Sequence, residues 1–494
     1  MPAPTRSAPR GPRKEPIRLR CELAISCLLP PCRGGQCKVC LPLIAGGETR
    51  LLDAVIEGGL IVSPEGAKPG AIAIRDGKIA GIAAPGEKLE ARERIDVSGC
   101  MVLPGLVDAH VHFRDPGLTH KEDFGSGTRA AAVGGVTTVM VMPTDKPMTT
   151  TPELFAEKRA LAERSAHVDF ALQAGLGPDT GHVRALCDLG AISFEVFLAD
   201  LPPPMLVATG EELLRCLEAV AAADRVAGIT PGDDSIVAAH TALGAAGREE
   251  SRRAFLASRP AVAEAIGLAR ACVAANAVRA RIHIRQVSAA ESVHVLRALK
   301  AAGVSAEVTP HNLLLEEDEI LRRGPIAKVV PPLRSRADLS SVQQALRAGV
   351  IDIVATDHAP HLPEEKAQGE VDLAKAPGGF PGVQTLLPLM LRLVEDNVID
   401  YPRLVEACCE APARLFGLFP AKGALRPGSD ADLVVLDPRL PFVIRNEDQL
   451  SRARLTPFDG WRTPASPVLT MLRGRIIARG MQVVSGPSGR FVRP

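Results

Sequence analysis

The stretch Leu106–Gly117 reads LVDAHVHFRDPG, an apolar run that ends in two histidines, an arginine and a Pro-Gly stop. Successive side chains of a β-strand point to opposite faces, so His110, His112 and Arg114 lie on one face. Two imidazoles placed in this way can hold one metal ion. However, a lone His-x-His arises easily by chance, and buried histidines are often only hydrogen-bonded. Taken alone, the stretch leaves metal binding and a structural role equally open.

A second histidine-rich segment, Thr356–His361, also follows an apolar strand-like run. Several histidines between the two segments stand at the ends of similar runs. In a barrel of parallel strands the C-terminal ends meet at one face, where active sites gather. The repeated placement of histidines at strand ends therefore favours a metal site at the mouth of a barrel.

Strand-like runs alternate with helical stretches rich in Ala, Leu, Arg and Glu between about residues 105 and 419. This alternation is typical of parallel β/α architecture. We expect eight strands, at 106–113, 136–142, 168–175, 191–198, 235–240, 281–287, 304–310 and 351–357. Helices at 152–164, 211–223, 259–275 and 289–301 separate most of them. The sequence thus predicts an α/β fold with a (β/α)8 TIM-type barrel.

The two flanks of this region, 50–104 and 420–494, have a different character. Asp53–Glu57 and Ala71–Arg75 alternate and are punctuated by glycines, which is typical of short antiparallel strands. Ala431–Leu436 and Val468–Ile477 show the same pattern near the other end. Residues 1–49 form a basic extension in which we expect disorder. An organellar address or a zinc site in this extension is an alternative, although its cysteine spacing matches no established zinc pattern.

The composition excludes several classes of partner. A net charge of +1 over 494 residues gives no global field for nucleic acid or an anionic membrane. No apolar run reaches the length that spans a bilayer. Of the 11 cysteines, five crowd the region from Cys21 to Cys40 and the rest are scattered, which indicates reduced thiols in a cytoplasmic protein. A small molecule is therefore the expected partner.

Together, these motifs resemble those of the cyclic amidohydrolases, and dihydroorotases most closely, with allantoinases and hydantoinases as near relatives. The resemblance extends from about Leu51 to the C-terminal region. It implies that both chain ends fold into one small β-sandwich, with the barrel inserted between them. The matching segments are His110–Gly117, Thr309–His311, Pro331–Ser335, Ala355–His361 and Ser429–Val434.

The resemblance implies that one zinc ion is held by His110, His112 and Asp357. Hydrolysis of a cyclic amide needs an activated water, a polarised carbonyl and a proton for the leaving nitrogen. A metal ion supplies the first two, because it lowers the pKa of a bound water to about 7. Asp357 would act as both a ligand and the base that moves the proton. Its alternative role as a helix cap is disfavoured because an apolar run delivers it to a strand end.

A second metal ion would depend on residues that depart from the family pattern. Glu195 stands where relatives carry a carboxylated lysine, and its side chain is shorter by roughly 3–4 Å. His240 matches the histidine of strand 5. Gln286 replaces the histidine of strand 6, and an amide oxygen is a poor zinc ligand. We therefore expect the second ion to be weakly held or absent.

The substrate contacts implied by the resemblance are mixed. Arg114 matches the arginine that binds the dihydroorotate carboxylate, and His361 matches a second contact on that side. Thr144 and Val330 stand where dihydroorotases carry asparagines, which implies a different or more apolar ring substituent. Gly378 and Gly379 belong to a loop that resembles the family loop over the substrate. An ordinary connector explains this loop nearly as well.

The leading hypothesis is a dihydroorotase-like hydrolase of pyrimidine biosynthesis that opens the C–N bond of a cyclic amide. An enzyme similar to allantoinase or hydantoinase is an alternative. Another is a catalytically impaired pseudo-dihydroorotase that acts as a structural partner of aspartate carbamoyltransferase. The presence of His110, His112 and Asp357 favours an enzyme, because a catalytically impaired barrel has no need of metal ligands. We further expect a homo-oligomer without nucleic-acid or membrane partners.

Overall fold

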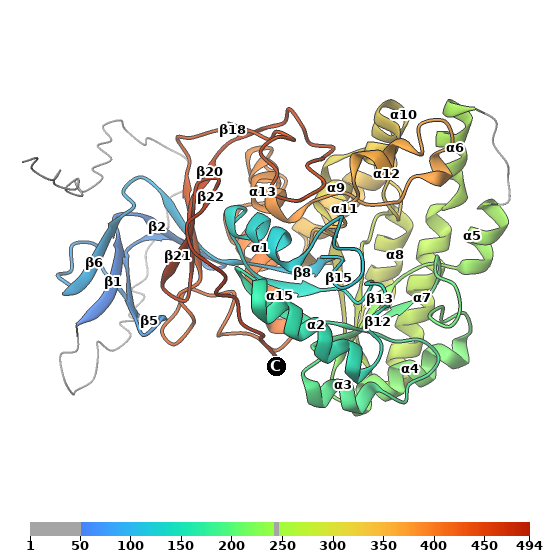
Figure 1. The fold of residues 1–494 in the computed structure, drawn as a ribbon, viewed down its shortest axis with the longest axis horizontal. Coiled ribbons are helices and arrows are strands. Elements are labelled where there is room, and N and C mark those ends of the chain that lie inside the picture. The colour runs from blue at the N-terminus through green and yellow to red at the C-terminus, as the bar shows by residue number, and fades with distance from the viewer. Residues whose placement is uncertain (1–50, 242–246) are drawn as a thin grey trace, which may run out of the picture.

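A computed structural model describes residues 51–241 and 247–494. The predicted N-terminal extension, 1–49, with its cysteine cluster, lies outside the described residues. Figure 1 shows a small β domain at one end of the molecule, on the left, and a larger β/α body on the right. The site described below belongs to the larger body.

The small domain consists of two sheets, to which strands from both flanks of the chain contribute. Their strand orders are β5-β4-β1-β6 and β22-β21-β20-β17-β7-β2-β3. Ile56 and Ile72 of one sheet share a buried apolar cluster with Val102, Leu433 and Met471 of the other. The strands are β1 Leu52–Glu57, β2 Leu60–Ser63, β3 Gly66–Pro69, β4 Ala71–Arg75, β5 Lys78–Ala83, β6 Ala91–Asp96, β7 Met101–Pro104, β17 Leu433–Asp437, β20 Ser466–Leu472, β21 Arg475–Arg479 and β22 Gln482–Val483. A separate hairpin pairs β18 Phe442–Val443 with β19 Arg462–Thr463.

The larger body is built on parallel strands in the orders β10-β9-β8 and β11-β12-β13-β14-β15-β16. Only Gln173 separates β10 from β11, and a bridge between Val111 and His358 links the first strand to the segment after the last. The strands are almost wholly buried, as in a barrel surrounded by helices. They are β8 Leu106–Val111, β9 Val136–Val141, β10 Asp169–Leu172, β11 Ala174–Gly175, β12 Ser193–Phe197, β13 Val226–Thr230, β14 Arg281–Ile284, β15 Val304–Val308 and β16 Ile353–Val354.

Helices lie between and around these strands, and side-chain caps fix where several of them begin. Thr151 caps α2, and Thr209 and Glu212 cap α4 reciprocally, so that backbone N–H groups of each first turn are satisfied. The α-helices are α1 Phe124–Val133, α2 Pro152–Ser165, α3 Val183–Leu189, α4 Gly210–Ala222, α5 Asp234–Thr241, α6 Arg248–Ser258, α7 Ala261–Val278, α8 Ala290–Leu299, α9 Pro310–Leu314, α10 Asp318–Arg323, α11 Arg336–Arg347, α12 Pro363–Ala367, α13 Leu386–Glu395, α14 Tyr401–Val405 and α15 Ala411–Leu415.

The prediction of the fifth strand at 235–240 was wrong. The strand is β13, Val226–Thr230, and the predicted segment belongs to α5. Both segments are short and apolar, so hydrophobicity alone does not separate them. The difference lies in Asp233, whose carboxylate accepts a hydrogen bond from the backbone N–H of Ile236 and so starts a helix.

One helical stretch among the described residues, 248–278, is long and apolar enough to cross a membrane by length and composition alone. It comprises α6 and α7, and half of its most apolar window is buried. Helix α7 packs against α4 and α8, as an outer helix of a barrel does.

A buried cluster of charges joins the small domain to the barrel. The Lys422 ammonium group contacts Asp169, which begins β10, and lies 2.9 Å from Asp430 and 2.8 Å from Asp432. The Arg473 guanidinium group also contacts Asp169. The three carboxylates lie close enough together to hold a cation, and Lys422 is that cation.

The segment around Phe491 crosses back onto the barrel. Val492 donates its backbone N–H to Phe170 O at 2.8 Å, and Phe170 donates to Arg490 O at 3.0 Å. The Phe491 ring packs against Phe170 and beneath the Arg159 guanidinium group, 4.4 Å from the ring centre. This segment thus supplies β10 with backbone partners on its free edge.

Candidate functional site

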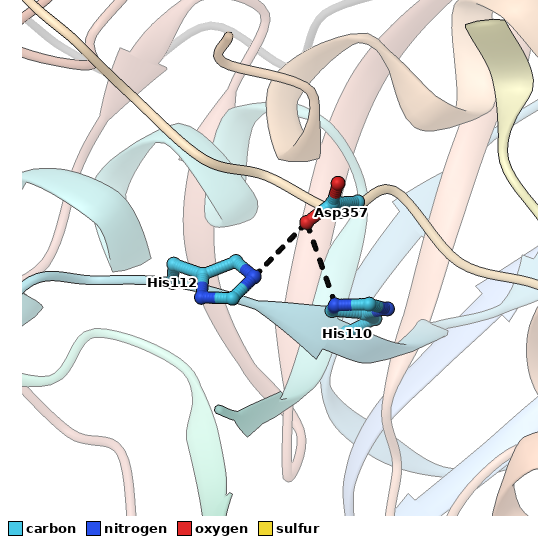
Figure 2. Close-up of side chains that lie close together, drawn as sticks. All are labelled: His110, His112 and Asp357. Carbon is cyan, nitrogen blue, oxygen red and sulfur yellow. Dashed lines mark hydrogen bonds and ion pairs between the residues drawn. The ribbon is translucent and has the colours of Figure 1, made fainter. Parts of the chain in front are cut away.

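Three side chains, His110, His112 and Asp357, converge at the C-terminal ends of the first and last barrel strands. Asp357 Oδ1 lies 2.9 Å from His112 Nε2 and 3.4 Å from His110 Nε2 (Figure 2). The two imidazoles come from β8 and the segment that follows it, with their Nε2 atoms toward the carboxylate. Their ligand atoms all lie within 4.8 Å of one another. The structure thus brings together the three residues that the sequence predicted as the first metal site.

Each imidazole makes a hydrogen bond through its second ring nitrogen, Nδ1. His110 Nδ1 donates to Glu307 Oε1 at 2.5 Å, so in the neutral imidazole the Nε2 lone pair is available to a metal ion. His112 Nδ1 lies 2.5 Å from the Thr144 hydroxyl, which can donate or accept. Histidine ligands of metals are typically oriented by such partners. This donor set therefore fits a tetrahedral zinc ion with one position left for water.

Burial and neighbouring charges set the protonation of the triad. Burial lowers the pKa of His112 to about 3, so its imidazole is neutral at pH 7. Burial would lower the pKa of His110 and raise that of Asp357, but the opposite charges around each reverse both shifts. Asp357 is therefore ionised at neutral pH, as a metal ligand and a base must be.

Asp357 has two further supports. Gln286 Nε2 donates to its Oδ2 at 2.6 Å, and the same amide lies 3.3 Å from the Val330 carbonyl. Asp108 on β8 accepts from both the backbone N–H and the hydroxyl of Thr356, the residue before Asp357. These bonds fix the last strand against the first at the site.

The residues predicted for a second metal site do not converge. His240 lies exposed at the end of α5, because the segment that was predicted as a strand is a helix. Thr230 occupies the end of the true fifth strand, and its hydroxyl donates to Glu195 Oε1 at 2.7 Å. Glu195 Oε2 accepts from Arg285 Nε at 3.0 Å. Glu195 is therefore paired within the barrel, and Gln286 supports Asp357.

A pocket of about 440 Å³ opens above the triad. Arg114 lines it and has positive φ, and its buried Nε has no hydrogen-bond partner among the described residues. Arg114 Nη2 lies 3.2 Å from His361 Nε2, and Lys121 Nζ lies 3.2 Å from His361 Nδ1. Burial and these cations lower the pKa of His361 to about 2, so the ring is neutral. A neutral imidazole offers only one acceptor nitrogen, so it cannot serve both cations.

Lys121 is neutralised by Glu365, 2.9 Å away, whereas Arg114 makes no ion pair among residues 51–241 and 247–494. The guanidinium of Arg114 thus faces the same pocket as the triad without a direct ion pair. An anionic group is its natural partner.

Apolar side chains also line the pocket, among them Phe197, Leu201, Phe255, Pro260 and Val330. Gly378 and Gly379 also line the pocket. Gly379 has φ +116°, and a Cβ there would lie 2.6 Å from Ala359 Cβ. Only glycine fits this position without strain.

Two buried lysines hold the loop that carries these glycines. Lys328 Nζ donates to the carbonyls of Leu373 and Ala376, and Lys366 Nζ donates to those of Lys328 and Pro377. Burial lowers the pKa of Lys366 to about 7 and that of Lys328 to about 8. The loop is therefore held by hydrogen bonds from two buried lysines.

Glu307 and Arg285 are two residues of the site that sequence reasoning missed. Both are fully buried, and both lie in or directly after barrel strands. The available signal was a charged residue inside an apolar run expected to form a buried strand, since such charges are almost always paired.

Comparisons with known proteins agree with this geometry. The model of the amidohydrolase family matches residues 101–477. The chain is 38% identical to an allantoinase of Rubrobacter xylanophilus, with 90% of this chain and 98% of that protein covered. It is 36% identical to a dihydroorotase of Methanothermobacter thermautotrophicus, over 85% of this chain and 93% of that protein. The solved L-hydantoinase of Arthrobacter aurescens is similar with a TM-score of 0.86 and 34% identity, over 90% of this chain and all of that one.

Proposed function

Since this chain belongs to the amidohydrolase family, we propose that it is a zinc-dependent hydrolase that opens the C–N amide bond of a cyclic amide. The observation that carries the proposal is the convergence of His110, His112 and Asp357 beneath an open pocket. Its fold is proposed to be a closed (β/α)8 barrel inserted in a β-sandwich. The protein is proposed to be cytoplasmic. In support, the six described cysteines are all free and buried, as expected for a reduced compartment.

In this proposal His110, His112 and Asp357 hold one zinc ion. When bound, the ion would lower the pKa of a water and polarise the scissile carbonyl. Asp357 takes the proton released by the attacking water and delivers it to the ring nitrogen that leaves. Gln286 keeps the Asp357 carboxylate oriented during both transfers through its bond to Oδ2.

For the substrate we propose a ring that carries a carboxylate, as dihydroorotate does. The guanidinium of Arg114, which makes no direct ion pair among the described residues, supports this choice, because a carboxylate can accept two hydrogen bonds from it. His361, neutral and 3.2 Å from Arg114, would contact the same carboxylate. Opening the ring would then be the dihydroorotase reaction of pyrimidine biosynthesis.

A second candidate is a hydantoin with an apolar substituent. Phe255 and Val330 support it, because they form an apolar wall in the same pocket. The alternative of a silent barrel partnered with aspartate carbamoyltransferase is disfavoured, because the complete triad has no use in it.

Arg114→Met separates the two substrates. For dihydroorotate we expect kcat/KM to fall about 100-fold, since charge-assisted hydrogen bonds are lost. For a neutral 5-substituted hydantoin the variant should retain the wild-type rate. Wild-type protein that hydrolyses the hydantoin but not dihydroorotate would overturn the carboxylate assignment. Zinc-loaded protein that opens no cyclic amide, including allantoin and dihydropyrimidines, would overturn the proposed function itself.

We also propose that the protein is a homo-oligomer through α7. Val262, Ile266 and Val273 lie on one face of this helix and are 48%, 41% and 59% exposed. A contiguous apolar face of this kind typically marks a protein interface. The double change Ile266→Lys plus Val273→Lys should convert the assembly to monomers in light scattering, and an unchanged mass would exclude this face.

A further inference from the structure

Arg285 is a fully buried cation that is connected to His110 through the Glu307 carboxylate. It follows β14, is fully buried and contacts two carboxylates. Its Nε donates to Glu195 Oε2 at 3.0 Å, and its Nη1 donates to Glu307 Oε2 at 3.0 Å. The remaining nitrogen, Nη2, donates to Gln173 Oε1. A guanidinium stays protonated at every accessible pH, so this positive charge is permanent.

Each oxygen of the two carboxylates already accepts at least one hydrogen bond. Glu195 Oε1 accepts from Thr230, while its Oε2 accepts from Arg285. Glu307 Oε1 accepts from His110, and its Oε2 accepts from His283 and Arg285. Arg285 therefore links a residue on β12 to the carboxylate that orients His110.

The barrel leaves space for this arrangement at Gly228 on β13. A Cβ at this position would lie 2.1 Å from Glu195 Oε2 and 2.9 Å from Arg285 Nη2. Contacts this short cannot be accommodated without displacing the ion pair. The Glu195–Arg285 ion pair therefore requires glycine at position 228.

Without Arg285, two buried carboxylates, the Thr230 hydroxyl and the Gln173 amide would surround the vacated volume. Buried carboxylates without a counter-ion are strongly unfavourable, and oxygen-rich cavities of this kind bind divalent cations. We propose that Arg285 is a built-in cation that takes the place of a second metal ion beside Glu195 and so limits the protein to one. The proposal rests on the proposed function, because it takes the His110–His112–Asp357 triad as the site of that single ion.

The central test is the metal stoichiometry of the full chain, measured by equilibrium dialysis with excess zinc and excess magnesium, an ion that oxygen ligands suit, followed by elemental analysis. We expect one ion per chain in the wild type and two in Arg285→Met, which keeps the bulk and removes the charge. The matched control Arg285→Met plus Glu195→Gln removes one carboxylate as well and should return to one ion. Two tightly bound ions in the wild type, or equal stoichiometry in both variants, would overturn the proposal.

Glu195→Gln alone gives an independent test that does not depend on the folding of the arginine variant. The amide keeps the shape and an acceptor for Arg285, so the variant should retain one ion with unchanged affinity. Loss of zinc from this variant would mean that Glu195 is a metal ligand and would overturn the proposal.

Urea unfolding of the metal-free protein tests the role of Arg285 independently of the proposed function. Arg285→Met should unfold at lower urea than the double variant, because its two carboxylates repel each other. This comparison holds even if the triad binds no zinc. If both variants unfold at the same urea concentration, Glu195 and Glu307 do not repel each other in the absence of Arg285, which would overturn the proposal.

Discussion

Gln286 Nε2 lies 2.6 Å from Asp357 Oδ2, so the residue that follows β14 supports the carboxylate that follows β16. We expect Gln286→Leu to lower kcat about tenfold, because one hydrogen bond to a charged group is lost. The zinc content should not change. Steady-state kinetics and elemental analysis on the same preparation check both statements, and loss of zinc would show that the amide is a ligand.

His110→Ala should abolish both zinc binding and hydrolysis, since it removes one of three ligands. The matched control is His240→Ala, because His240 is exposed on α5 and remote from the pocket lining. The control should retain wild-type zinc content and rate. If it lost an ion, the segment around α5 would have to reach the site in solution.

Glu195→Lys combined with Gln286→His should not restore a second metal site, although it installs the residue types that the resemblance places at these positions. A lysine at position 195 that is not carboxylated would face Arg285, so two cations would meet where an ion pair stood. We expect one ion per chain and a lower unfolding midpoint than in the wild type. Two ions in this variant would contradict the role given to Arg285.

Lys422→Met should be among the most destabilising single changes in the chain. It leaves the buried Asp169 and Asp432 and the half-buried Asp430 without their shared cation. Removing one partner of a buried ion pair typically costs about 3–5 kcal/mol of unfolding free energy. Urea titration measures this loss. Lys78→Met, which removes an exposed ammonium from Asp430, is the control and should change stability by less than about 1 kcal/mol.

The lowered pKa of Lys366 predicts that the free energy of unfolding increases with pH. Its pKa is about 7 in the folded chain and 10.5 in the unfolded chain, so the unfolded chain binds more protons between these values. The free energy of unfolding of the wild type, relative to Lys366→Met, should therefore increase from pH 7 to about pH 10. The size should be a few kcal/mol at most, on the order given by linkage. A difference that is flat with pH would mean that Lys366 titrates normally.

The pairing of His110 with His112 could be predicted from the sequence, because the period of a strand places both on one face. Asp357 was added to them by the resemblance to the cyclic amidohydrolases, and it follows the apolar strand Ile353–Val354. The helices α2, α4, α7 and α8 were predicted within a few residues for the same reason, that their patterns are local.

The supports of the triad could not be predicted because they depend on pairings between distant strands. Glu195 and Arg285 are 90 residues apart, and nothing near either residue indicates the other. The fifth strand was missed for a local reason. The runs Val226–Thr230 and Ser235–His240 are alike in hydrophobicity, and a single capping aspartate made the second a helix.

The contact between Phe170 and Arg490 has a consequence for synthesis on the ribosome. Strand β10 is made early, but Phe170 on its free edge finds its backbone partners in Arg490 and Val492, about 320 residues later in the chain. Until those residues emerge, the backbone groups of Phe170 are unpaired, and an unpaired strand edge is prone to association with other chains. The nascent barrel therefore carries an incomplete strand edge until translation reaches Arg490.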